Sequence, residues 1–121
     1  MKVPERFHRA LLDQCRHWPW VARVWLFGSR ARGDCSERSD IDLAVEAPSA
    51  DARQWSAVTT WCDERAPTLL RIDVVRWERA AAGLRDKVAR QGVLLHERGG
   101  DDDGERVRDL DEPVQGVGSI E

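Results

Sequence analysis

The sequence predicts one α/β domain, of the α+β kind, in which a small mixed β-sheet is flanked by helices. Its 121 residues match the size of a single ordinary domain. Segments with helical periodicity alternate with short apolar runs, in the order helix, strand, strand, helix, strand, helix. Residues 28–40, which join the first two predicted strands, are too few for a comfortable helical crossover. A mixed sheet is therefore favoured over a purely parallel one.

Proline and glycine delimit the elements of the first third of the chain. Apolar side chains at three- and four-residue steps predict a helix from Glu5 to Trp18, which Pro19 ends. The apolar run from Trp20 to Phe27 is rich in β-branched and aromatic residues and predicts a largely buried strand. The polar segment from Gly28 to Asp34 is too short for a full helix, and we expect a loop with room for one helical turn.

The middle of the chain predicts a strand followed by a helix. Ile41 to Val45 alternates in the manner of a strand. An apolar stripe predicts a helix from Asp51 to Arg65, for which either Ser49 or Asp51 is a suitable N-cap. Pro67 ends this helix because proline cannot continue it.

The last third predicts a strand, a helix and a short final strand. Leu69 to Val75 forms the third strand, and Glu78 to Gln91 forms the third long helix, with Gly92 as its C-terminal cap. The residues Val93 to Leu95 add a short strand. Three residues of the helix are expected to face the core, namely Ala81, Leu84 and Val88.

Composition indicates a globular protein with a strongly charged surface, since 41% of its residues are hydrophobic and 34% are charged. The net charge is −3, yet residues 99–121 alone carry eight acidic and two basic side chains. We therefore divide the chain into a folded domain, residues 1–98, and an acidic, disordered tail, residues 99–121. The weak positive surplus of the domain suits an anionic substrate such as a nucleotide but does not predict binding to duplex DNA.

The sequence favours a cytoplasmic protein without a membrane partner. No apolar run approaches the ~20 residues that cross a bilayer, and the first residues lack the apolar core of a signal peptide. Cys15, Cys35 and Cys62 form an odd number without a CxxC spacing, so we interpret them as reduced thiols. The three histidines show no spacing with cysteine that predicts a zinc site.

Two acids stand at the start of the second predicted strand. The period of two in a strand places Asp40 and Asp42 on one face, while Ile41 and Leu43 enter the core. Like charges held close together repel unless a cation or a shared proton neutralises them, and an oxygen-only ligand set suits Mg²⁺. An isolated Asp-x-Asp also fits a solvated strand entrance with two ordinary acids.

A glycine and a serine precede these acids at the end of the first predicted strand. Gly28 lets the backbone approach a phosphate closely, and exposed N–H groups with the Ser29 hydroxyl can donate to its oxygens. Two familiar phosphate loops are excluded, because Gly33 is followed by Asp34 instead of lysine and no Gly-x-Gly-x-x-Gly occurs. Without the acids, this pair also fits an ordinary turn that ends a strand.

A third acid interrupts the apolar third strand. A carboxylate is costly there unless it is paired or bound to a metal. If this strand lies beside the second one, Asp73 joins Asp40 and Asp42 on one surface. The alternative is an ion pair with Arg71, Arg76 or another arginine.

The combined pattern resembles the minimal nucleotidyltransferases of the DNA polymerase β-like superfamily. Their pattern is a hydrophobic strand, Gly-Ser, about ten residues, Asp-x-Asp and a third Asp on a later strand. In this sequence the pattern reads Leu26-Phe27-Gly28-Ser29, Asp40-Ile41-Asp42 and Ile72-Asp73-Val74. The likeness covers most of residues 5–97 and all three acids, so it implies a polymerase β-like nucleotidyltransferase fold and an active enzyme.

The resemblance implies a two-metal mechanism. Two Mg²⁺ ions, roughly 3.5–4 Å apart, are bridged by Asp40 and Asp42 and hold the phosphates of ATP. Asp73 binds the metal nearest the attacking hydroxyl and accepts its proton, and attack occurs in line at the α-phosphorus.

The resemblance also implies which residues hold the nucleotide. Gly28 and Ser29 hold the β- and γ-phosphates, and Arg30 or Arg32 neutralises charge on the departing pyrophosphate. Because the chain is rich in arginine, both arginines also fit the alternative of solvated loop residues.

Family members of this size are often antitoxins that silence a HEPN-domain toxin by transferring AMP to one of its tyrosines. The resemblance therefore implies a HEPN-domain partner and leaves a hetero-oligomer open. A domain of 98 residues has little material to bind an acceptor, which favours an acceptor platform on another chain. Two alternatives remain: a binding module that neutralises its partner by contact alone, and a nucleotidyltransferase that modifies a small molecule such as an antibiotic.

Overall fold

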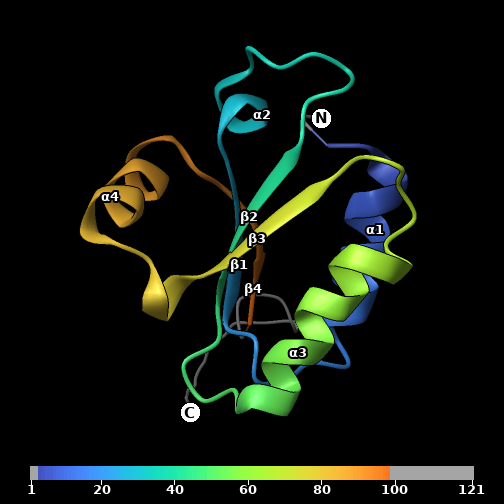
Figure 1. The fold of residues 1–121 in the computed structure, drawn as a ribbon, viewed down its shortest axis with the longest axis vertical. Coiled ribbons are helices and arrows are strands. Elements are labelled where there is room, and N and C mark those ends of the chain that lie inside the picture. Colours follow the sequence, from blue (N-terminus) through green and yellow to red (C-terminus); the bar gives the residue numbers. More distant parts are fainter. Residues whose placement is uncertain (1–2, 99–121) are drawn as a thin grey trace, which may run out of the picture.

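A computed structural model describes residues 3–98, which form one four-stranded sheet with helices on both sides (Figure 1). The predicted acidic tail, residues 99–121, lies outside the described residues. None of the helices within residues 3–98 is both long enough and apolar enough to cross a membrane.

The sheet is mixed, as the sequence predicts. Its strands are β1 (Arg23–Phe27), β2 (Ile41–Glu46), β3 (Ile72–Arg76) and β4 (Val93–Glu97). They lie in the order β3-β2-β1-β4, with β1 antiparallel to both β2 and β4, and with β2 parallel to β3. The helical segment between β2 and β3 supplies the long crossover that a parallel pair needs. The final strand is longer than predicted and forms one edge of the sheet.

One face of the sheet packs against α1 (Glu5–Cys15) and α3 (Ala52–Thr60), which lie on the same side in Figure 1. The core between them consists of almost completely buried apolar side chains, among them Phe7, Leu11, Val24, Leu26, Ile41, Leu43 and Val58. The core face therefore contains every second residue of β1 and β2, and the intervening residues are left for the other face.

Helix α1 ends three residues earlier than predicted. Residues 16–18 continue as tight turns, in which Arg16, His17 and Trp18 donate to carbonyls three residues before them. Trp18 is nevertheless buried, because its ring lies edge-on against that of Trp61, with 5.9 Å between the ring centroids. The periodicity therefore indicated correctly which side chains are buried, but not where the helix stops.

Helix α3 begins at the predicted N-cap and continues into a π-helical turn, η1 (Trp61–Arg65). The carboxylate of Asp51 accepts from Gln54 N at 2.7 Å, and Gln54 Oε1 accepts from Asp51 N at 2.9 Å, so both halves of a capping box are present. The wider π turn places two consecutive side chains, Trp61 and Cys62, in buried positions. The helical segment thus ends at Arg65, as predicted.

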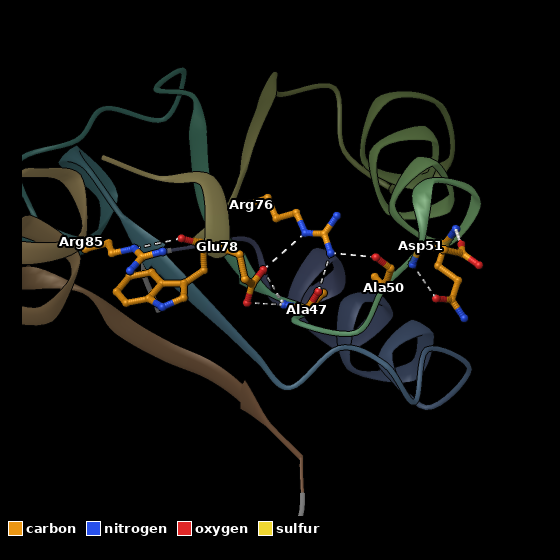
Figure 2. A network of polar contacts seen from close by, with 8 residues as sticks. Ala47, Ala50, Asp51, Arg76, Glu78 and Arg85 are labelled. Atoms are coloured by element: carbon orange, nitrogen blue, oxygen red, sulfur yellow. Dashed lines mark hydrogen bonds and ion pairs between the residues drawn. The ribbon is translucent and has the colours of Figure 1, made fainter. Parts of the chain in front are cut away.

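A network of polar contacts fastens the β2–α3 turn to the end of β3 (Figure 2). Arg76 Nη2 donates to Ala47 O at 2.7 Å and to Ala50 O at 2.8 Å. Glu78 accepts from Ala47 N at 3.1 Å, and the Arg76 guanidinium lies 5.4 Å from the centre of the Trp55 ring. This network holds the two parallel strands together at the end where they finish.

The other face of the sheet carries α4 (Ala82–Gln91), preceded by a 3₁₀ turn, η2 (Trp77–Arg79). The predicted helix from residue 78 is therefore interrupted. The Trp77 ring packs at a tilt against Trp25 of β1, with 4.9 Å between the ring centroids, and the Arg85 guanidinium lies 5.3 Å from the centre of the Trp77 ring. These contacts hold η2 against the sheet before α4 begins.

The core-facing side of α4 is narrower than predicted. Val88 is buried and Leu84 is half-buried, but Ala81 is exposed, so its predicted core position is wrong. Ala81 precedes the helix and has an extended backbone, which turns it away from the inward stripe.

Gly92 is the C-cap, as predicted, yet its φ is −70°. A Cβ there would come within 2.5 Å of Val88 O, so close approach, and not left-handed geometry, favours glycine.

Candidate active site

Two of the predicted acids lie side by side across the parallel strand pair. Asp42 of β2 and Asp73 of β3 are register partners, while their neighbours Ile41 and Leu43 are fully buried on the core face. Asp40 directly precedes β2 and acts electrostatically on Asp42. The structure therefore brings the three acids to one region at the start of the parallel strands.

The predicted glycine–serine turn lies against the same carboxylate. Phe27, the last residue of β1, is the register partner of Asp42, and Gly28 follows it with a φ of 78°. A Cβ on Gly28 would overlap Asp42 Oδ2 and lie 3.2 Å from Asp42 Cγ. Only glycine allows this close approach with this positive φ. The turn leads into α2 (Ser29–Arg32), a single helical turn. The sequence predicts a loop with room for one such turn in this segment.

The Asp42 carboxyl lies in an unfavourable environment for a negative charge. Partial burial raises its pKa above the ordinary value of 3.8, and the nearby charges of Asp73 and Asp40 raise the pKa further. Arg32 acts in the opposite direction. A bound cation would relieve this repulsion.

Asp73 also forms the ion pair that the sequence left open as an alternative. Arg71 Nε lies 3.1 Å from Asp73 Oδ1, and both side chains are solvent-accessible. Arg76, the other candidate, binds Ala47, Ala50 and Glu78 instead. The ion pair and the proximity to Asp42 coexist, and an exposed pair of this kind is weak enough for a cation to displace it.

The two arginines of α2 have different environments. The guanidinium of Arg30 is buried and donates to the carbonyls of Ser39 at 2.9 Å and Glu37 at 3.0 Å. Arg32 is exposed, with its Nε 3.2 Å from Asp34 Oδ2. Sequence reasoning missed the burial of Arg30, for which the only signal was its position between the Gly28–Ser29 turn and the apolar Ala31.

The donor set fits Mg²⁺. Within residues 3–98 no three His, Cys, Asp or Glu side chains are close enough together to enclose an ion by themselves. Mg²⁺ does not need such an enclosure, since one or two carboxylates, substrate phosphates and water complete its coordination. Asp42 with Asp40 or Asp73 would supply the carboxylates. Burial and then the charges of Asp73 and Asp40 raise the pKa of Asp42, and a cation would balance these charges.

A polar hollow of about 310 Å³ borders Asp73 on the edge of the sheet. Its lining residues come from α3, η1 and β3 and include Thr59, Thr60, Cys62, Asp63 and Glu64. Two further hollows, of about 450 and 550 Å³, lie along α1 and α3 and contain none of the predicted site residues. Of these three spaces, only the first adjoins the predicted site.

The sequence matches a known family over most of its length. Residues 11–101 match the family model for polymerase beta, nucleotidyltransferase. Comparison with curated proteins yields no match. The match spans β1, α2, β2 and β3, the elements that carry the acids and the glycine turn.

Several solved structures share the fold. A variant of the toxin–antitoxin complex MntA–HpeT is 25% identical, with a TM-score of 0.58 over 75% of this chain and 72% of that one. A toxin–antitoxin structure with AMP-PNP is 24% identical, with a TM-score of 0.56 over 76% and 74%. A tri-AMPylated HEPN toxin in complex with an MNT antitoxin, from Shewanella oneidensis, is 23% identical, with a TM-score of 0.55 over 80% and 73%.

The mixed sheet and the family match define the class of protein as a nucleotidyltransferase with the polymerase β-like fold. The chain belongs to the polymerase beta nucleotidyltransferase family.

Proposed function

We propose that this chain is an antitoxin that transfers AMP from ATP to a tyrosine hydroxyl of a HEPN-type partner toxin, in a Mg²⁺-dependent reaction. The observation that carries the proposal is the register of Asp42 with Asp73, next to the turn formed by Gly28. Nucleotidyl transfer needs carboxylates beside a phosphate-binding turn, and this arrangement supplies both.

Each group of the site has a defined task in this reaction. Asp40 and Asp42, with Asp73, would hold two Mg²⁺ ions, which supply charge neutralisation for the triphosphate and lower the pKa of the attacking hydroxyl. The Asp73 carboxylate accepts the hydroxyl proton as the tyrosine oxygen bonds to the α-phosphorus and pyrophosphate leaves. These carboxylates lie on the face of the sheet opposite the buried core of β2.

The phosphates are held at the turn. The backbone N–H groups after Gly28 and the Ser29 hydroxyl donate to the β- and γ-phosphates. Arg32, the exposed arginine of α2, neutralises the pyrophosphate, and breaking its weak surface pair with Asp34 costs little. Arg30 supports the same turn from its buried position.

Relatives support the partner and the transferred group. The structures described above include a HEPN toxin that carries AMP in complex with an MNT antitoxin, and a toxin–antitoxin structure with AMP-PNP. The described domain contains the sheet and few other elements, so an acceptor on a separate protein fits its size. The polar hollow of about 310 Å³ that borders Asp73 offers space for an acceptor side chain.

The test is transfer of label from α-³²P-ATP to the co-expressed HEPN partner. We expect Mg²⁺-dependent labelling of a tyrosine, and a loss of roughly 10²–10⁴-fold in rate for Asp73→Asn, because the proton acceptor is removed. Asp86→Asn is the matched control, since Asp86 lies on α4 and pairs with Arg90 away from the site. Absence of label in the wild-type reaction with every common nucleotide would refute the proposal.

Asp42→Ala separates catalysis from binding. If the variant binds its partner but no longer protects cells from it, neutralisation is enzymatic. If it protects as well as wild type at equal expression, the chain neutralises its partner by contact alone and the proposed catalytic role is wrong.

A further inference from the structure

Arg30 is the one buried charged side chain among residues 3–98, with 6% of its surface exposed. A buried guanidinium is costly unless its donors are satisfied. Arg30 Nε donates to Ser39 O at 2.9 Å, and Nη2 donates to Glu37 O at 3.0 Å and to Ser36 O at 3.4 Å. The planar fork of arginine donors therefore holds three carbonyls of one loop.

This loop leads directly into the predicted metal-binding acids. Residues 33–40 connect α2 to β2, and most of their side chains are exposed. The Ser39 carbonyl belongs to the planar peptide group that continues into Asp40, so holding this oxygen restricts the position of the Asp40 backbone. Arg30 itself follows the Gly28–Ser29 turn, whose backbone lies against Asp42.

The hydrogen bonds within residues 36–39 do not by themselves attach this part of the loop to the rest of the domain. Ser36 N donates to Ser39 Oγ at 3.0 Å, and Ser39 N donates to Ser36 O at 3.2 Å. These bonds close a small turn but connect it to nothing else. The Arg30 guanidinium connects the turn to α2, which is a different element of the site.

We propose that Arg30 is a positioning residue that fixes Asp40 relative to Asp42 by clamping the 36–39 loop to the phosphate-binding turn, and that Arg32 alone of this pair contacts the nucleotide. The inference rests on the proposed function for its catalytic consequence. Arg30 acts through Asp40, so its loss should weaken metal binding while leaving the metal-independent contacts with the nucleotide unchanged.

The test compares Arg30→Lys with Arg38→Lys. Both substitutions keep the charge, and Arg38 is an exposed residue of the same loop. Lysine cannot reproduce the planar fork, so we expect Arg30→Lys to weaken Mn²⁺ binding in the presence of a non-hydrolysable ATP analogue by about 10–100-fold, the usual effect of removing a group that orients a metal ligand. Isothermal titration calorimetry measures this affinity. Arg38→Lys should stay within about twofold of wild type.

Nucleotide affinity in EDTA distinguishes positioning from phosphate binding. We expect Arg32→Ala to weaken it and Arg30→Lys to leave it unchanged. A loss for Arg30→Lys equal to that for Arg32→Ala would make Arg30 a phosphate ligand and overturn the proposal, and so would unchanged metal and nucleotide affinities in Arg30→Lys.

Amide hydrogen exchange tests the clamp without any ligand. Exchange in residues 35–41 should accelerate in Arg30→Lys but not in Arg38→Lys, with α1 and α3 unaffected. General loss of protection, or failure to fold, would identify Arg30 as a residue of overall stability and overturn the proposal. If wild type binds neither metal nor nucleotide, the proposed function fails, while the exchange experiment still decides whether Arg30 holds the loop.

Discussion

One glycine brings the backbone of the β1–α2 turn against the Asp42 carboxylate. Gly28 has both a positive φ and no room for a Cβ, so two independent constraints favour glycine at this position. The proposed phosphate-binding turn and the proposed metal ligand Asp42 therefore lie against each other at a single residue.

Gly28→Ala should damage the site more than the fold. The backbone conformation of Gly28, with φ 78° and ψ −158°, costs roughly 1–3 kcal/mol for a residue with a Cβ, and the added methyl group must displace the Asp42 carboxylate. We expect loss of Mg²⁺–nucleotide binding, measured by calorimetry. Gly83→Ala is the control, because nothing lies within 4 Å of its Cβ position in α4, and it should stabilise by up to about 1 kcal/mol. Unchanged ligand binding in Gly28→Ala would contradict the described turn.

Asp42 should lower the stability of the metal-free protein at neutral pH. Because its pKa is raised on folding, its ionised form is less favourable in the folded protein than in the unfolded chain. The contribution of Asp42 to the free energy of unfolding is fully present below pH 3.8. This contribution is lost as the pH rises through the raised pKa of Asp42 in the folded protein.

Asp42→Asn therefore should stabilise the metal-free protein at pH 7, and this gain should vanish below pH 3.8, as measured by urea unfolding at both pH values. Added Mg²⁺ should raise the melting temperature of wild type but not of the variant. A variant that is less stable than wild type at pH 7 without metal would show that ionised Asp42 does not destabilise the folded protein.

At the scale of elements, the helix that follows β2 begins at a well-defined cap. The sequence left Ser49 and Asp51 as alternatives, and the structure selects Asp51 because only its side chain takes part in the capping box. This cap holds the first turn of α3, whose buried Val58 packs on the face of the sheet behind the carboxylates. The start of α3 therefore supports the strands from the core side.

Asp51→Ala should cost about 1 kcal/mol of unfolding free energy, with a range of about 0.5–2 kcal/mol, because the backbone N–H of Gln54 at the start of α3 loses its acceptor. Ser49→Ala is the matched control, and its exposed side chain predicts a change within about 0.5 kcal/mol. Urea denaturation measures both. An effect of Ser49→Ala larger than that of Asp51→Ala would reverse the assignment of the cap.

At the scale of the whole molecule, the end of β4 is fastened to the end of α1. Arg98 donates to Val21 O at 3.0 Å, Cys15 O at 3.0 Å and Trp18 O at 2.9 Å. Its backbone N–H also donates to Ala22 O at 2.8 Å. One residue therefore donates to four carbonyls of α1 and the residues that follow it. This contact lies at residue 98, where the sequence places the end of the folded domain.

A chain cut after Arg98 should keep the melting temperature and the ligand affinity of the full chain, because it retains the described core and sheet and every predicted site residue. Arg98→Ala in the full chain should instead cost about 1–3 kcal/mol, since several carbonyls lose a charged donor. Thermal and urea unfolding check both. If the cut chain loses stability or binding, the predicted division at residue 98 is wrong.

The sequence by itself determined most of the elements and named the residues of the candidate site. The alternation of Ile41 and Leu43 with Asp40 and Asp42 predicts which side chains leave the core, and a glycine after an apolar strand predicts a turn. These features depend on residues adjacent in the chain, where backbone geometry alone sets the direction of each side chain.

Only the tertiary structure decided which acids meet and what each arginine does. The register of Asp42 with Asp73 depends on how β3 returns beside β2 after a helix and a π turn. The burial of Arg30 depends on a loop folding back over α2, and the exposure of Ala81 depends on where the 3₁₀ turn docks. The physical reason is the same in each case. Contacts between distant segments depend on the packing of the whole domain, and the local periodicity of the sequence carries no information about that packing.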